Sequence, residues 1–215
     1  MKIYISPSSQ TANMYAGQNI SEASVCRKIG EFLENALIRN GVTVKLANEN
    51  LTYQERVAES NAWGSDYHVA IHTNAGGGKG TRLFCTESTS NLDITKAVFE
   101  SVSALTPTDP DRIVENYTLY EIKKTTMPCL YLEVEFHDNE NLAKWILDNV
   151  ENIGESICKG LVGEKYIGEQ PTKEEVTTES KLYRVQVGAF KNRDNAVRLL
   201  EQLTALGFPC YITKG

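Results

Sequence analysis

Long apolar runs and clusters of basic residues are both missing from this sequence of 215 residues. No stretch of eighteen apolar residues occurs, so nothing indicates a membrane span, and the N-terminal MKIYISPSSQ lacks the apolar core of a signal peptide. The net charge is -6 and no five basic residues follow one another, which argues against a general nucleic-acid binder. We therefore expect a protein made in the cytoplasm, with no membrane span and no nucleic-acid partner.

Paired cysteines are also missing. The sequence has no CxxC pair, which argues against a zinc knuckle or a redox motif. Its five cysteines are odd in number, widely spaced and mostly surrounded by apolar residues, so we expect reduced structural thiols and a reducing compartment. These residues are Cys26, Cys85, Cys129, Cys158 and Cys210.

What is present is an alternation of strand and helix patterns. Hydrophobic residues make up 41% of the chain and charged residues 23%, which is typical of one core of medium size with a small appendage. The alternation predicts an α/β fold, with a mostly parallel twisted sheet flanked by helices. The predicted strands are residues 2–6, 43–47, 66–75, 81–85 and 130–136, and the predicted helices begin near residues 21, 52, 92 and 141.

The last fifty residues differ in character. Residues 164–181, GEKYIGEQPTKEEVTTES, are polar and without periodicity, and we interpret them as a linker. Residues 182–215 predict a strand, a helix and a second strand, a small βαβ unit that is too short to bury a core of its own. The predicted organisation is thus a main domain over residues 1–163, a linker and half a domain.

Three titratable side chains alternate with apolar ones in PCLYLEVEFHDN, residues 128–139. Successive side chains of a strand point to opposite faces, so Glu133, Glu135 and His137 are expected to share one face. A solvated edge strand would show the same pattern. In open α/β sheets, however, the functional crevice lies beyond the carboxyl ends of the strands, and this is where the three residues fall.

Histidine is scarce, since His68, His72 and His137 are the only three. His72 ends a predicted strand, and Glu22 begins the first predicted helix at the same edge of the sheet. Zinc hydrolases use three ligands drawn from histidine and carboxylates, with a separate carboxylate that handles protons. A metal site at this edge is one interpretation, and a hydrogen-bonded structural role for His72 is the other.

Two segments resemble a known family. AIHTNA, residues 70–75, resembles the SIHxNA box of the zinc-dependent N-acetylmuramoyl-L-alanine amidases of the amidase-3 family, and PCLYLEVEFHDN resembles their PxxLxExGFxxN box. The likeness covers residues 1 to about 162. It implies a hydrolase that uses Zn²⁺ to cleave the amide between the lactyl group of N-acetylmuramic acid and the L-alanine of the stem peptide.

The resemblance also implies roles for individual residues. His72 and Glu22 would be zinc ligands, and Glu133 would be the catalytic carboxylate that activates the zinc-bound water. Asn74, which lies within the first box, and Glu135 are expected to contact the substrate.

The chain departs from the family at three positions. The family opens with a DPGHGG-like box whose histidine is the first zinc ligand, and here SPSSQT places Ser9 at that position. A hydroxyl is a poor zinc ligand. Glu135 replaces the glycine of the second box, and His137 stands where an apolar residue is usual.

We therefore hypothesise that His137 replaces the lost imidazole. The metal set would then be Glu22, His72 and His137, with Glu133 as the base. Gln10 or Glu135 are the alternatives for the vacant ligand position. If none of them fills it, the chain binds cell walls without cutting them.

The tail YRVQVGAFKNRDNAVRLLEQLTALGFPCYI resembles the first half of a SPOR repeat, a ferredoxin-like module that binds glycan strands lacking stem peptides. Tyr183, Gln186, Gly188 and Phe190 stand at its signature positions, and Tyr183, Gln186 and Phe190 are expected to contact glycan. Because only half of the repeat is present, either two chains pair as a homodimer to complete it or the module binds weakly.

Together the two resemblances imply a peptidoglycan hydrolase whose partner is the bacterial cell wall. Without a signal peptide, it would reach the wall as an endolysin released through a holin, or as an autolysin in a mother cell that undergoes cytolysis. Two rival functions remain open: a catalytically inactive peptidoglycan-binding protein, and a zinc peptidase that cuts the stem peptides.

Overall fold

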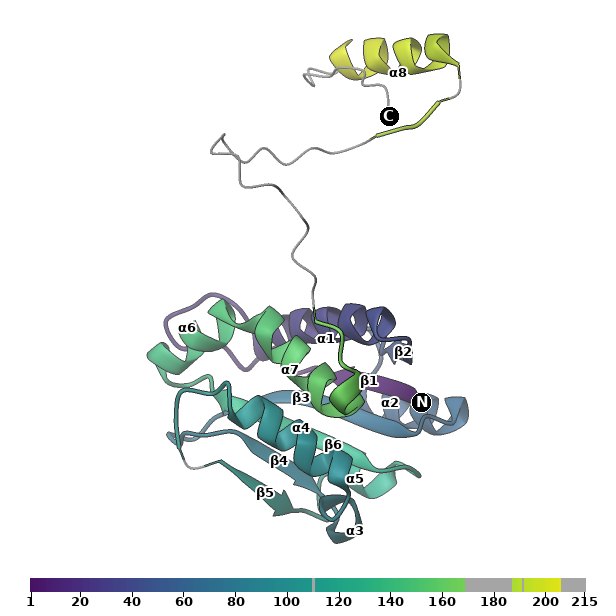
Figure 1. The fold of residues 1–215 in the computed structure, drawn as a ribbon. Helices are drawn as coiled ribbons and strands as arrows, with labels where there is room; N and C mark the ends of the chain where they lie inside the picture. The colour runs from purple at the N-terminus through teal and green to yellow at the C-terminus, as the bar shows by residue number, and fades with distance from the viewer. Residues whose placement is uncertain (110, 169–186, 191, 206–215) are drawn as a thin grey trace. The chain divides into compact units, whose positions relative to one another are not determined.

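The computed structural model describes residues 1–109, 111–168, 187–190 and 192–205 (Figure 1). The chain divides into two compact units, Met1–Gln170 and Pro171–Gly215. Within the described residues, no helix combines the length and the apolar character that crossing a membrane requires.

The first unit is built on a six-stranded sheet with the order β2-β1-β3-β6-β4-β5. All neighbouring strands are parallel except β4 and β6, which confirms the predicted mostly parallel sheet. The strands are β1 (Lys2–Pro7), β2 (Thr43–Leu46), β3 (Tyr67–Asn74), β4 (Arg82–Cys85), β5 (Arg112–Glu115) and β6 (Cys129–Phe136).

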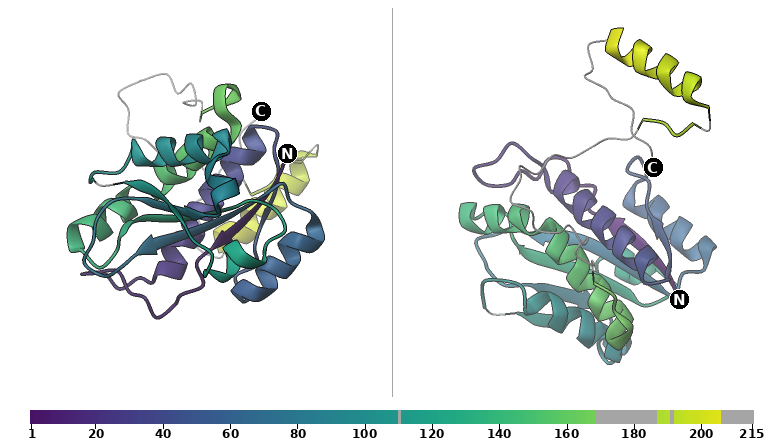
Figure 2. Two further views of the ribbon diagram at one scale, coloured as in Figure 1. Left: turned by 90° about the horizontal axis from the view of Figure 1, so that it is seen from below. Right: turned by 45° about the horizontal axis from the view of Figure 1, so that its top comes forward.

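Helices cover both faces of this sheet (Figure 2). In one layer, α7 packs against both α1 and α4, and all three helices contribute to the main core. In the other layer, α2 and α5 contact each other, α2 contacts β1 and α5 contacts β6. The helices are α1 (Glu22–Arg39), α2 (Tyr53–Trp63), α3 (Glu87–Ser90), α4 (Asp93–Ser103), α5 (Tyr120–Lys124), α6 (Glu140–Asp148) and α7 (Val150–Val162), followed by the 3-10 turn η1 (Gly163–Lys165).

The long helix predicted from residue 141 is in fact two helices. Asn149 ends α6 and precedes α7 with a φ of -123°, outside the helical range. Its backbone N–H donates to Ile146 O at 3.1 Å and its carbonyl accepts from Ile153 N at 2.9 Å. Asparagine competes for local backbone groups and favours helix ends, so the break falls at a residue suited to it.

The core is formed by the central strands and the helices α1, α4 and α7. Ile5, Ile71 and Leu132 of β1, β3 and β6 are fully buried, as are Ile29 of α1 and Ile157 of α7. The four cysteines that the structure describes are buried and free, as predicted, whereas Cys210 lies outside the described residues.

The packed part of the first unit continues past the predicted boundary at residue 163. Tyr166 donates its hydroxyl hydrogen bond to the carboxylate of Glu155, and Ile167 N–H donates to Asn40 Oδ1 at 2.6 Å. The first residues of the predicted linker are therefore attached to the C-terminal end of α1 and to the middle of α7.

In the second unit the structure describes residues 187–190 and the helix α8 (Arg193–Ala205), at the place of the predicted helix. Residues 187–190 have no regular secondary structure, and the rest of the two predicted strands lies outside the described residues. Tyr183 and Gln186 also lie outside them. Phe190 is exposed, and its ring lies beside Gly188.

Candidate active site

The start of α1 places Glu22 at the carboxyl end of β3. Ser21 caps the helix by accepting a hydrogen bond from Ser24 N–H, and Glu22 is the first helical residue, where a carboxylate is favoured by the helix dipole. The N–H of Glu22 donates to Asn13 O at 2.8 Å, which folds the preceding loop back onto the helix. As a result the Glu22 side chain is 1% exposed and points toward the sheet.

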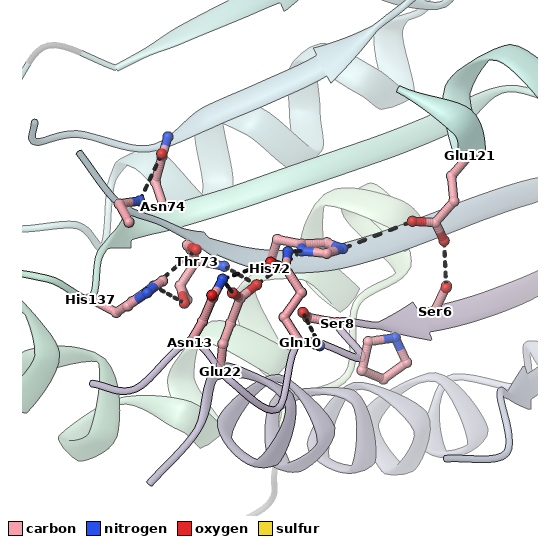
Figure 3. Close-up of polar contacts among 12 residues, drawn as sticks. Ser6, Ser8, Gln10, Asn13, Glu22, His72, Thr73, Asn74, Glu121 and His137 are labelled. Carbon is pink, nitrogen blue, oxygen red and sulfur yellow. Dashed lines mark hydrogen bonds and ion pairs between the residues drawn. The ribbon is translucent and has the colours of Figure 1, made fainter. Parts of the chain in front are cut away.

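Glu22 and His72 meet at this edge (Figure 3). Glu22 Oε1 lies 2.9 Å from His72 Nδ1, and Glu22 Oε2 accepts from Asn13 Nδ2 at 2.9 Å. Burial alone would raise the pKa of Glu22, but the hydrogen bond and charge of His72 and the Asn13 amide hold it below its usual value. Burial likewise disfavours the charged imidazole, yet the nearby carboxylates of Glu121 and Glu22 raise the pKa of His72 to about 9.

Glu133 lies beside His72 in the ladder between β3 and β6. Among the buried polar atoms that the structure describes, Glu133 Oε2 has no hydrogen-bond partner. Burial raises the pKa of Glu133 to about 7, and the negative charge of Glu22 contributes to the rise. A carboxylate with a pKa near neutrality is suited to accept and return a proton during a reaction.

Ser9 stands at the position of the missing first ligand in the sequence, and Gln10 follows it. Gln10 Nε2 lies 3.5 Å from His72 Nδ1, while Gln10 Oε1 accepts from Asn13 Nδ2 at 2.6 Å. The oxygen of the Gln10 amide faces the Asn13 donor, which Glu22 holds in turn, so the amide presents its nitrogen to His72 and would have to turn to offer its oxygen to a metal ion. Of the alternatives considered from the sequence, Gln10 is the one beside His72.

A β-bulge in β6 changes the predicted face of the residues that follow it. His72 pairs with Glu133, but Asn74 pairs with Phe136, so β6 uses three residues where β3 uses two. Glu135 lies in this bulge with a φ of 58°. Since paired residues share a face, Phe136 takes the face of Glu133, and the alternation is shifted by one residue beyond the bulge.

The structure does not bring His137 to Glu22 and His72, contrary to the hypothesis from the sequence. His137 Nδ1 lies 2.9 Å from Thr73 Oγ1 and 3.0 Å from Thr73 O, and the ring stacks on Tyr15 at a centroid distance of 5.1 Å. Thr73 alternates with His72 along β3, so the bulge has placed His137 against the other face of the strand. Its imidazole contacts the end of β3 and does not join Glu22 and His72.

Glu135 is also directed away from the site. It is fully buried, and its carboxylate accepts hydrogen bonds from the Gly80 N–H at 2.9 Å and from the Thr108 hydroxyl. The positive φ of this residue is the conformation that glycine adopts without strain, and glycine is what the resembling family box has here. Glu135 therefore joins the bulge to the loop before β4, and the structure gives it no contact with His72.

Asn74 contacts its own loop. Its Oδ1 accepts from Ala75 N–H at 2.8 Å, and Figure 3 shows the side chain apart from Glu22 and His72. Next to it, Asp138 accepts hydrogen bonds from the N–H groups of Gly76 and Gly77. Both side chains thus fasten the glycine-rich turn after β3, and a substrate contact of Asn74 stays a prediction.

A cavity of about 380 Å³ lies beside His72, and neither this cavity nor the Glu121 carboxylate that lines it was predicted from the sequence. Glu121 comes from α5, and Tyr53, Tyr120 and Tyr131 also line this cavity. Only five residues long, α5 is too short to show a helical period in the sequence.

Glu22 and His72 offer ligand atoms that Zn²⁺ prefers. These are a carboxylate oxygen of Glu22 and an imidazole nitrogen of His72. Among the described residues, no group of three or more histidine, cysteine, aspartate or glutamate side chains is placed to hold a metal ion. Glu22 and His72 therefore offer two protein ligands for a metal ion. Gln10 is the polar side chain beside them, and its amide oxygen would provide a third ligand after the amide turns.

Comparison with known proteins agrees with this architecture. Residues 8–162 match the family model described as N-acetylmuramoyl-L-alanine amidase, and residues 164–215 match the SPOR domain. The catalytic domain of CwlV, an N-acetylmuramoyl-L-alanine amidase from Bacillus (Paenibacillus) polymyxa var. colistinus, has a similar fold, with a TM-score of 0.68 at 20% identity over 74% of this chain and 95% of that one.

Two curated relatives are similar along nearly the whole chain. The N-acetylmuramoyl-L-alanine amidase CwlM of Bacillus licheniformis is 26% identical over 221 residues, which cover 99% of this chain and 84% of the relative. The sporulation-specific N-acetylmuramoyl-L-alanine amidase of Bacillus subtilis strain 168 is 27% identical over 222 residues, with 97% and 82% covered. By its sequence match and its fold, the chain belongs to the N-acetylmuramoyl-L-alanine amidase family of hydrolases.

Proposed function

We propose that this chain is a peptidoglycan hydrolase that cleaves the amide between N-acetylmuramic acid and the L-alanine of the stem peptide, and that Glu22 and His72 hold a catalytic Zn²⁺. The observation that carries the proposal is the 2.9 Å contact between Glu22 Oε1 and His72 Nδ1, next to the buried and unpartnered Oε2 of Glu133. Gln10 is the proposed third ligand, and His137 has no part in the set.

Zn²⁺ bound by these residues supplies a Lewis acid that lowers the pKa of water and polarises the scissile carbonyl. The protein's own residues handle the proton. Glu133 accepts a proton from the attacking water and returns it to the nitrogen of the departing L-alanine, which leaves as an amine, while the lactyl group becomes a carboxylate. The pKa of Glu133, about 7, suits both transfers near neutral pH.

The test combines metal content with the chemistry of digested cell walls. We expect about one Zn²⁺ per wild-type chain and new N-terminal L-alanine on purified walls. Glu133→Gln should keep the metal and lose the activity, because it removes the proton acceptor and leaves the ligands in place. His72→Ala should lose both.

Three other outcomes would point elsewhere. New internal amines from the stem peptide would identify a peptidase. Walls that are bound but not cut by a wild type without Zn²⁺ would identify an inactive binding protein. Loss of Zn²⁺ in Glu133→Gln would place Glu133 among the ligands and overturn the division of roles.

For the second unit we propose binding to glycan strands that lack stem peptides, which are the product of the first unit. The SPOR match over residues 164–215 and the exposed ring of Phe190 support this assignment. Cosedimentation with walls stripped of stem peptides, for the full chain and for Phe190→Ala, tests it. Contacts of Tyr183 and Gln186, and the pairing of two chains, stay predictions, as does release by a holin or by lysis of a mother cell.

A further inference from the structure

The cavity beside His72 extends the candidate active site in a direction that the proposed mechanism does not use. Its volume of about 380 Å³ is within the range of about 300–1,000 Å³ that is typical of small-molecule sites. Glu121, which lines the cavity, lies on the side of His72 away from Glu22 (Figure 3). Neither Glu22 nor Glu133 is among the described residues that line it, so a group bound there lies beside the proposed reaction centre and leaves both carboxylates free.

Aromatic rings form much of the wall of this cavity. Tyr53, the first residue of α2, is 44% exposed, and Tyr120, the first residue of α5, is 38% exposed. Their rings meet edge to face, with a centroid distance of 5.3 Å and an interplanar angle of 78°. A third ring, that of Tyr131, is buried and stacks on His72 at a centroid distance of 4.4 Å. The aromatic lining therefore extends from the solvent to His72.

Arg56 and Glu121 bring opposite charges to the wall, and both side chains are buried. Burial lowers the pKa of the Arg56 guanidinium, and the negative charge of Glu121 opposes this shift. The guanidinium also donates hydrogen bonds to the backbone carbonyls of Pro7 and Glu49. Because this cation is already engaged and a carboxylate lies in the same wall, the cavity fits a neutral group better than an anionic one.

We propose that this cavity binds the glycan side of the substrate, with a sugar ring packed on Tyr53 and Tyr120. The inference rests on the proposed function, in which N-acetylmuramic acid carries the scissile amide. A short ether link joins its sugar ring to the scissile carbonyl, so the ring must lie close to the metal site. N-acetylated sugars are neutral and present apolar C–H faces with hydroxyl groups at the edge, which suits the faces and hydroxyl tips of tyrosines. The stem peptide, in contrast, carries carboxylates.

The test compares two small substrates that have the same scissile amide. One is an N-acetylmuramoyl peptide, and the other has lactic acid in place of N-acetylmuramic acid and so lacks the sugar ring. We expect Tyr53→Ala and Tyr120→Ala each to lower kcat/KM on the muramoyl peptide by about three- to tenfold, mainly through KM, because a packing contact with an aromatic ring is lost. On the lactoyl peptide both variants should match the wild type. Tyr53→Phe keeps the ring and should retain most of the activity on the muramoyl peptide.

Tyr117→Ala is the matched control. Tyr117 is also exposed, but its hydroxyl accepts a hydrogen bond from Glu87 N–H and it is not among the described residues that line the cavity. Its removal should leave kcat/KM unchanged on both substrates. Equal losses on the two substrates in Tyr53→Ala and Tyr120→Ala would assign the cavity to the stem peptide and overturn the proposal, and so would the absence of any loss.

Saccharide binding separates this inference from the proposed function. The disaccharide of N-acetylglucosamine and N-acetylmuramic acid, without a stem peptide, is titrated into the full chain carrying Phe190→Ala, which removes the proposed glycan contact of the second unit. Weaker binding in Tyr53→Ala and Tyr120→Ala, in a chain that cuts no walls, would reject the proposed function and keep the sugar site. If walls are cut but neither small substrate is, this titration decides, and an unchanged affinity in both tyrosine variants overturns the proposal.

Discussion

Asn74 of β3 lies opposite Phe136 of β6, one residue further along β6 than the pairing of the preceding residues would place it. This single shift decides which side chains reach the site. It leaves Glu133 beside His72 and turns His137 toward Thr73.

Replacing Glu135 by glycine should show how the bulge is stabilised. Glycine adopts the φ of 58° without strain, but the change leaves the buried Gly80 N–H without its acceptor. An unsatisfied buried donor costs about 1–3 kcal/mol, about as much as one strained backbone residue. Because the Thr108 hydroxyl loses its acceptor as well, we expect a net loss of about 1 kcal/mol. Urea unfolding measures this change in the free energy of unfolding. Glu135→Ala is the control, because it keeps the backbone strain and should therefore lose more stability.

His137→Ala should leave the zinc content unchanged. Its ring contacts Thr73 and Tyr15, so the variant should lose about 1–2 kcal/mol of stability through a missing hydrogen bond and aromatic contact. Gln10→Ala should show the opposite pattern, with an unchanged free energy of unfolding and a lower affinity for zinc. The reverse pattern in metal titrations of the two variants would restore His137 to the ligand set.

The pH dependence of kcat/KM should report Glu133. The residue acts as a base only when ionised, and its pKa is raised to about 7. Activity should therefore fall by about tenfold per pH unit below neutrality and level off above it. A profile measured on purified walls from about pH 5 to pH 9 checks this, and an acid limb centred near the ordinary pKa of glutamate, about 4.3, would contradict it.

The contact between α4 and α7 should be intolerant of even one methyl group. A Cβ atom at Gly160 would lie 2.7 Å from Val98 N, which belongs to the backbone and cannot turn aside. We expect Gly160→Ala to lose about 1–3 kcal/mol from overpacking. Thermal unfolding measures this loss. Lys159→Ala, at the exposed neighbouring residue, is the control, and its unfolding temperature should change little.

The sequence predicts those features that depend on local pattern. The alternating strands and helices, the start of α1 near residue 21 and the position of His72 at a strand end follow from periodicity and from the order of the elements. Glu22 and His72 could be assigned to one edge because parallel strands and their helices place their ends predictably.

The features that the sequence did not predict depend on contacts between distant segments. The bulge exists because the β3–β6 pairing shifts, and the sign of it within residues 128–139 is Glu135, at the position where the resembling family box has glycine. Likewise Glu121 is buried because Ser6 and His68 surround it, and its helix of five residues carries no pattern of its own. A strand of four residues, β5, was missed for the same reason.

The hydrogen bond from Ile167 to Asn40 places the last described residues of the first unit at the C-terminal end of α1. Asn40 caps the far end of α1, whose first residue is Glu22, and its 18 residues span about 27 Å. The described residues of the first unit thus end a full helix length from Glu22, so the last contacts of this unit leave the catalytic edge uncovered.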